Sequence, residues 1–192
     1  MLKKLSLLFV YLLVICQLNS QKIQPTARKG WIFGTSFGRA YSILNIPDKD
    51  LSQGGLAVDL KIGYMLKADL GLLITSNISI YDYEGFGRPR KRDFGVLAPS
   101  VQYWFNNKVW ALGGVGLGGD NPVFWDIKSP DNDPLETKYY NGLGLVAAVG
   151  YEVLQFDKCI VDLKAKVTYR NVNVKEGNSD GTSVAILVGI NF

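Results

Sequence analysis

The charged residues with the most regular spacing recur at every second position of segments that also carry apolar residues. Asp59 and Lys61 share one face of the segment 55–65, and an acid and two lysines share one face of the segment 158–170. Residues two apart on a β-strand point to the same side, so each set forms a charged stripe opposite an apolar one. Such stripes could carry ions or protons, line a polar pore, or pair with one another. The charged set expected on one common face is Asp59, Lys61, Glu152, Asp162, Lys164, Lys166 and Arg170, accompanied by Asn77 and Gln102.

One residue type that is central to common catalytic chemistry is missing. The chain contains no histidine, which removes His-based triads, the commonest general base and the usual zinc ligands. Four acids between Asp126 and Glu136 are interrupted by prolines and do not match the spacing of an EF-hand loop. The glycines of 113–119 follow no strand-to-helix pattern, so they do not form a phosphate-binding loop. We therefore expect no enzymatic activity, no cofactor and no metal site.

Eight alternating segments must position the charged stripes. Short connections alternate with longer polar ones in strict order, which is the layout of an up-and-down barrel. A strand of such a barrel crosses a bilayer in about 9–11 residues. The sequence thus predicts an all-β fold: an eight-stranded antiparallel up-and-down transmembrane β-barrel. Its strands are expected at 31–41, 55–65, 70–80, 94–105, 108–118, 140–152, 158–170 and 182–192, with long connections at 42–54, 81–93, 119–139 and 171–181.

Periodicity alone does not say which face of the sheet is buried. In a soluble barrel the apolar face points inward, whereas in a membrane barrel it faces lipid. Gly142, Gly144 and Ala148 oppose the apolar face of 140–152, and a soluble core made of such residues would be nearly empty. We therefore expect the charges to fill a narrow lumen as a salt-bridge network. The aromatic residues expected at the membrane interfaces are Tyr41, Tyr64, Tyr81, Trp104, Phe105, Tyr139, Tyr140, Tyr151 and Tyr169.

Residues 1–20 have the layout of a secretory signal peptide. Lys3 and Lys4 precede an apolar run of roughly 12 residues, which is shorter than the ~20 that a spanning helix needs. Cleavage after Ser20 would leave 21–30 as a short periplasmic segment and 31–192 as the barrel. Loss of the two lysines lowers the formal charge from +4 to +2, a balance that indicates no nucleic-acid partner.

Two further features fall near the ends of the predicted strands. The cysteine that remains after cleavage, Cys159, is expected to face lipid at one end of 158–170 and to be inert. The connection 81–93 carries a dense basic cluster that could grip lipopolysaccharide phosphates; solvation or pairing with acids of 119–139 is the alternative. The cluster consists of Arg88, Arg90, Lys91 and Arg92.

Two stretches resemble a known family. Residues 99–105 read Pro-Ser-Val-Gln-Tyr-Trp-Phe, and after Asn106-Asn107 the chain continues Val-Trp-Ala-Leu-Gly-Gly-Val-Gly. They resemble the fourth and fifth strands of small outer-membrane β-barrel proteins of Bacteroidota, which are mostly of unassigned function and often called porin-like. Gln102 stands where that family usually has arginine. Phe192 is similar to the C-terminal aromatic that the barrel-assembly machinery recognises. The resemblance implies an outer-membrane location, contact with lipid and lipopolysaccharide, and assembly by that machinery.

The expected function follows from location more than from chemistry. We expect an integral outer-membrane protein, a monomer with a lumen plugged by side chains, in a structural or surface-interaction role. A narrow porin-like channel for small solutes is one alternative. A secreted lipocalin-like ligand-binding barrel is another.

Overall fold

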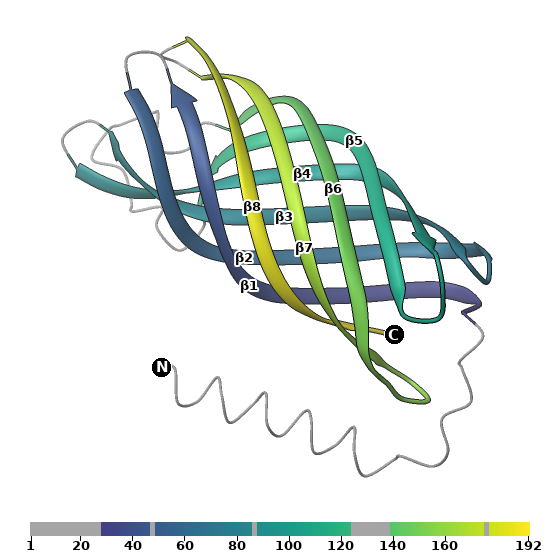
Figure 1. Ribbon diagram of the computed structural model, residues 1–192. Helices are drawn as coiled ribbons and strands as arrows, with labels where there is room; N and C mark the ends of the chain where they lie inside the picture. Colours follow the sequence, from purple (N-terminus) through teal and green to yellow (C-terminus); the bar gives the residue numbers. More distant parts are fainter. Residues whose placement is uncertain (1–27, 47–48, 86–87, 124–138, 175–176) are drawn as a thin grey trace, which may run out of the picture.

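The alternating segments form one closed sheet of eight antiparallel strands in the order β1 to β8 (Figure 1). The closure pairs β1 with β8, so that Phe37 lies opposite Val188, and the predicted fold class is confirmed. The computed structural model describes residues 28–46, 49–85, 88–123, 139–174 and 177–192. The strands are β1 (Gly30–Ile46), β2 (Lys49–Lys67), β3 (Leu70–Gly85), β4 (Arg88–Trp104), β5 (Val109–Pro122), β6 (Tyr140–Gln155), β7 (Ile160–Val174) and β8 (Gly177–Asn191).

The strands extend farther at one end than the sequence predicted. The connections 42–54, 81–93 and 171–181, expected as long loops, are almost entirely strand. Their residues are polar, but a ladder hydrogen-bonds through the backbone, so polar side chains do not end it. We call this end, where β1–β2, β3–β4 and β7–β8 are joined, the hairpin end. The opposite end, with the short β2–β3, β4–β5 and β6–β7 connections and Phe192, is the turn end.

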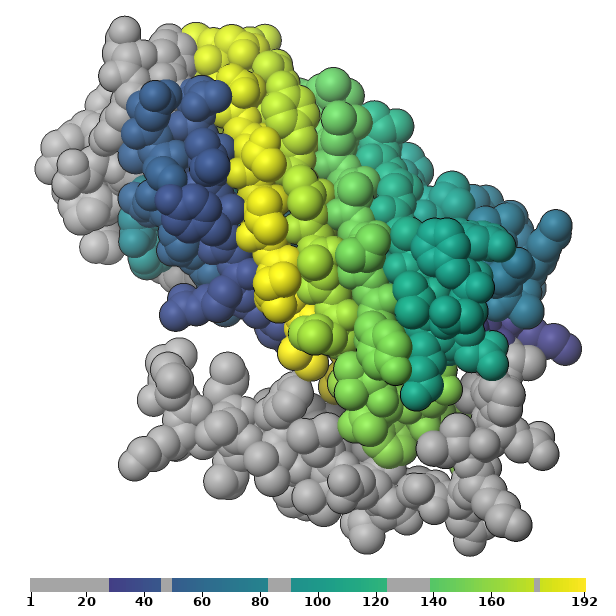
Figure 2. Space-filling model, in the orientation of Figure 1, coloured from purple at the N-terminus to yellow at the C-terminus, as the bar shows by residue number. Residues whose placement is uncertain are grey.

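A belt of exposed apolar and aromatic side chains surrounds the barrel. Leu60, Ile74, Leu117 and Ile186 are each about half exposed, and the oblique bands of β6, β7 and β8 lie side by side on the face in Figure 2. A soluble barrel would hide such residues, so this distribution argues against the lipocalin-like alternative. Apolar side chains on the outer face are what a bilayer requires.

The membrane-spanning part of the sheet can be read from where this belt ends. In β4 the exposed apolar residues begin at Leu97 and continue to Phe105, the residue after the strand. In β5 the last exposed apolar residue is Leu117. Residues of these strands beyond Leu97 and Leu117 therefore lie outside the apolar belt, at the hairpin end. Among the described residues, no helix is both long and apolar enough to cross a membrane.

The interior holds polar and aromatic side chains together. Phe94, Trp104, Trp110 and Leu112 are buried in one apolar cluster, beside the charged residues discussed below. Three expected interfacial aromatics are corrected here. Tyr140 falls on the inward-facing parity of β6, and its ring centre lies 5.6 Å from the guanidinium of the buried Arg92. Trp104 and Tyr81 are 6% and 2% exposed and point into the lumen, because their positions fall on the inward-facing parity of β4 and β3.

Cys159 also differs from the expectation. It lies just before β7, which begins at Ile160, and is buried rather than facing lipid. The chain is turning between Gln155 and Ile160, so the alternation of the strand does not yet apply to residue 159.

Candidate functional site: the charged lumen

The middle of the lumen is crossed by a carboxylate held between two lysines. Asp59 on β2 accepts hydrogen bonds from Lys164 through one oxygen and from Lys166 through the other, both on β7. All three side chains are about 2% exposed. Since β2 and β7 are not neighbours in the sheet, these ion pairs run across the lumen and tie the two strands together. We call this group the Asp59 cluster.

A second closure lies nearer the hairpin end and is centred on Asp120 of β5. Its carboxylate accepts from Arg92 of β4, from Arg170 of β7 at 2.6 Å and from the Tyr81 hydroxyl of β3 at 2.6 Å. Arg92 also donates to the Asp120 carbonyl oxygen at 2.8 Å. Burial raises the pKa of Asp120, but the charges of Arg170 and Arg92 outweigh it and hold that pKa below its ordinary value. This is the Asp120 cluster.

The sequence prediction missed three members of the Asp120 cluster. Tyr81 was expected at the membrane interface. Asp120 was placed in a long connection, and Arg92 in a surface-exposed basic cluster. The parity of the strands would have found Asp120 and Arg92. Asp120 continues the inward-facing series of even residues in β5, and Arg92 continues the series of Phe94 and Val96 in β4, once each strand is extended toward the hairpin end.

Lys91, another basic residue of that expected surface cluster, lies on the opposite face of β4 from Arg92. Lys91 is exposed and forms an ion pair with Asp82 of β3, whereas Arg92 points inward. The backbones of Arg88 and Arg90 belong to β4, and their side chains lie outside the described ones. The acids at 126–136 and the sequence 1–27 also lie outside the described residues.

At the turn end, Glu152 of β6 is held by three donors. Arg28 Nη2 donates to it at 2.8 Å, Trp104 Nε1 at 2.7 Å and Gln155 Nε2 at 2.6 Å. The Arg28 guanidinium also lies 4.9 Å from the centre of the Trp104 ring. Arg28, two residues before the start of β1, therefore covers this side of the lumen.

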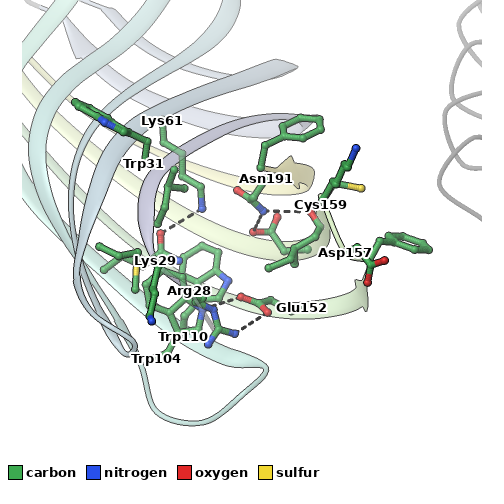
Figure 3. Close-up of a pocket in the computed structure, with 18 residues that line it drawn as sticks. Arg28, Lys29, Trp31, Lys61, Trp104, Trp110, Glu152, Asp157, Cys159 and Asn191 are labelled. Carbon is green, nitrogen blue, oxygen red and sulfur yellow. Dashed lines mark hydrogen bonds and ion pairs between the residues drawn. The ribbon is translucent and has the colours of Figure 1, made fainter. Parts of the chain in front are cut away.

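The last two charges of the predicted set, Lys61 and Asp162, are not paired with each other. Lys61 Nζ donates to Gln102 Oε1 at 3.2 Å and lies 5.0 Å from the Trp110 ring centre. Asp162 accepts from Asn191 Nδ2 at 3.0 Å. Lys61 and Asp162 both line a cavity of about 140 Å³ at the turn end, shown with Lys61, Trp110 and Asn191 around it in Figure 3. We call it the turn-end cavity.

Phe192 completes the closure of the sheet at the turn end. Its backbone N–H donates to the Phe33 carbonyl at 2.8 Å, and Phe33 N–H donates to its carbonyl at 3.1 Å. The ring is 62% exposed, on the outward side with the apolar belt. Among the described residues, no group of three or more potential metal ligands gathers.

Comparison with known proteins identifies the fold. The sequence matches no protein-family model and no curated protein. The attachment invasion locus protein Ail of Yersinia pestis, in complex with the heparin analogue sucrose octasulfate, matches with a TM-score of 0.54 and 15% identity, over 85% of this chain and 99% of that one. A second Ail structure gives a TM-score of 0.57 at the same identity and coverage.

Neisserial surface protein A gives a TM-score of 0.58 at 14% identity, over 85% of this chain and 98% of that one. These neighbours are small eight-stranded outer-membrane barrels. At such identities the likeness concerns the fold. That fold and the apolar belt together indicate the outer membrane, the location that the sequence predicted.

Proposed function

We propose that this protein is a non-enzymatic outer-membrane barrel with a closed lumen, and that its hairpin end serves as an interaction surface. The observation that carries the proposal is the pairing of the interior charges across the barrel. Asp59 joins β2 to β7, and Asp120 joins side chains of β3, β4 and β7. Each carboxylate is held by at least two cations.

The energetics of burial support a lumen that stays closed. An eight-stranded barrel has an interior just wide enough for side chains to fill. Removing one partner of a buried ion pair costs about 3–5 kcal/mol, because the other charge is left uncompensated. Opening a path through the Asp59 cluster would strand two lysines at once. The clusters therefore act as fixed plugs rather than as exchangeable sites.

The shape of the hairpin end supports a surface role. Strand pairing continues beyond the apolar belt, to Asn45–Asp50 between β1 and β2 and to Asn173–Asn178 between β7 and β8. Paired strands of this kind present exposed polar side chains, such as Lys91, on a regular backbone beyond the apolar belt. Ail, which shares the fold, binds a heparin analogue. For the present chain we propose lipopolysaccharide as a contact of Lys91.

Assembly and oligomeric state belong to the same proposal. Phe192 presents an exposed aromatic ring beside the β1–β8 closure, which suits recognition by the barrel-assembly machinery. A monomer is proposed because closure of the sheet leaves no unpaired strand edge.

Labelling of intact cells tests the placement of the two ends. We expect Asn173→Cys at the hairpin end to react with an impermeant thiol reagent and Asn107→Cys at the turn end to remain unlabelled, since both asparagines are exposed. The unsubstituted protein, with Cys159 buried, is the background control. Labelling of Asn107→Cys alone would mean that the barrel is inverted and would overturn the proposed surface role.

A narrow channel is the second candidate function, and the turn-end cavity favours it. The cavity reaches from the turn end to Lys61 and Gln102 inside the lumen. It would form the inner vestibule of a path if the Asp59 cluster could rearrange. Steady conductance would support this candidate.

A further inference from the structure

The turn-end cavity is lined by buried polar atoms that lack hydrogen-bond partners within the described structure. They are Gln102 Nε2, Asp162 Oδ1 and Asn191 Oδ1. The three side chains are 0%, 1% and 8% exposed, and all three line the same cavity. A buried polar atom without a partner is costly, so a group of them around one cavity points to a polar ligand.

The free atoms form one donor and two acceptors, and their orientation is fixed by charged neighbours. Gln102 Oε1 accepts a hydrogen bond from the Lys61 ammonium, which leaves the amide nitrogen as the donor without a partner. The Asn191 amide nitrogen donates a hydrogen bond to the Asp162 carboxylate, which leaves the Asn191 carbonyl oxygen as an acceptor without a partner. The amide flips that are otherwise ambiguous are therefore determined here.

Two of the charges that line the cavity are separated, whereas the buried Glu152 of the same lining is paired with Arg28. Lys61 and Asp162 make no ion pair with each other, and each contacts a neutral amide instead. In the Asp59 cluster, by contrast, a buried acid meets two ammonium groups directly. Lys61 and the Gln102 amide offer a cation and a donor, and Asp162 and the Asn191 carbonyl offer an anion and an acceptor. Together they complement a small molecule that carries one negative and one positive charge.

We propose that the turn-end cavity binds a small zwitterion of the amino-acid type. Its carboxylate would contact Lys61 and the Gln102 amide, and its ammonium would contact Asp162 and the Asn191 carbonyl. The assignment goes beyond the proposed surface role and does not depend on it.

The size and walls of the cavity set the class of zwitterion. One water needs roughly 10–15 Å³ of such space, so a volume of about 140 Å³ accommodates a molecule of several heavy atoms. Met65, Trp104 and Trp110 provide apolar walls between the polar groups. A zwitterion with a short carbon chain, such as glycine, fits this arrangement.

The decisive experiment compares three probes on the unsubstituted full barrel in detergent micelles. Nuclear magnetic resonance would follow the Gln and Asn side-chain amides and the Trp indoles during titration with glycine, methylammonium and acetate. We expect saturable shifts with glycine at concentrations at least about tenfold below those needed for either singly charged probe, because each of these lacks one of two charge-assisted contacts. Equal response to all three, or no saturable response to glycine, would overturn the proposal and leave a water-filled cavity.

Substitutions then assign the two charges, each with a matched control. Lys61→Met and Asp162→Asn should each weaken glycine binding at least about tenfold. Lys108→Met and Asp69→Asn make the same chemical changes at exposed turn-end residues outside the cavity lining and should leave binding unchanged. Loss of binding in the controls as well would contradict the assignment. If a cavity variant does not fold, the three-probe comparison on the unsubstituted barrel still decides.

Discussion

The Asp59 cluster and the turn-end cavity are built from the same residue types on the same strands, yet they differ in how the charges meet. Asp59 and Lys61 lie two apart on β2, and Asp162 and Lys164 two apart on β7. Asp59 contacts two ammonium groups, while Asp162 contacts one neutral amide. The first arrangement neutralises its charges internally and ties β2 to β7 across the lumen. The second leaves atoms without hydrogen-bond partners on residues that line a cavity, so the same two charged stripes supply both a cross-lumen ion-pair cluster and a candidate binding site.

The largest expected effect distinguishes these two acids directly. Asp59→Asn should lower the free energy of unfolding by about 3–5 kcal/mol, because it leaves Lys164 and Lys166 buried without a counter-ion. Asp162→Asn should cost far less, since no ion pair is broken. Urea unfolding in lipid vesicles at neutral pH measures both, and equal losses would remove the distinction between the two regions.

Leu60 sharpens the comparison, because it is adjacent to Asp59 in sequence but faces the lipid. Leu60→Arg should lower the free energy of unfolding by about 2–4 kcal/mol, as expected for a basic residue near the bilayer midplane. Leu60→Ile keeps the apolar surface and is the matched control. The same urea titration applies, and a Leu60→Arg barrel as stable as Leu60→Ile would mean that this face does not contact lipid.

Asp93 of β4, beyond Leu97 and outside the apolar belt, gives a pH-dependent contrast with the paired acids. Burial, and then the charge of Asp120, raise its pKa to about 6. Because the pKa of Asp93 is higher in the folded barrel than the ordinary value of 3.8, its neutral form favours the folded state. This contribution to the free energy of unfolding is fully present below pH 3.8 and is lost as the pH rises through 6. Asp93→Asn should therefore stabilise the barrel by about 1–2 kcal/mol at pH 8, and the difference from the unsubstituted protein should vanish at pH 4.

Unfolding midpoints measured between pH 4 and pH 8 test this prediction. Asp120, whose pKa is lowered, has the opposite sign, because its contribution is lost as the pH falls. A stabilisation by Asp93→Asn that does not change with pH would contradict the assigned cause.

The smallest expected effect removes one donor while leaving the ion pairs of the Asp120 cluster intact. Tyr81→Phe deletes the hydroxyl that donates to Asp120 at 2.6 Å but keeps Arg92 and Arg170 in place. We expect a loss of about 0.5–1.5 kcal/mol in the free energy of unfolding. A loss as large as that of Asp59→Asn would show that Tyr81, rather than the arginines, is the main partner of Asp120.

Strand alternation predicted the facing of side chains but could not predict their partners. Leu60 outward and Asp59 inward follow from a period of two on β2. Which residues meet across the lumen depends on the tilt and stagger of the closed sheet, which no single segment encodes. The contact of Asp59 with Lys164 and Lys166, and the separation of Lys61 from Asp162, became visible only in the structure.

The hairpin end was predicted less well for a related reason. Polar residues were interpreted as loops, although strands that continue into water keep the same alternation with polar side chains on both faces. Arg92 and Tyr81 were therefore assigned to the outer surface and to the membrane interface. Both are inward-facing residues of extended strands.

Single-channel recording in planar bilayers tests the central claim, that paired charges close the lumen. We expect no steady openings from the unsubstituted protein, because the Asp59 and Asp120 clusters cross the lumen at two levels. Lys164→Met, which removes one of the two cations held by Asp59, serves as the diagnostic variant. Steady openings of the unsubstituted barrel that disappear in Lys164→Met would contradict a closed lumen and identify a channel.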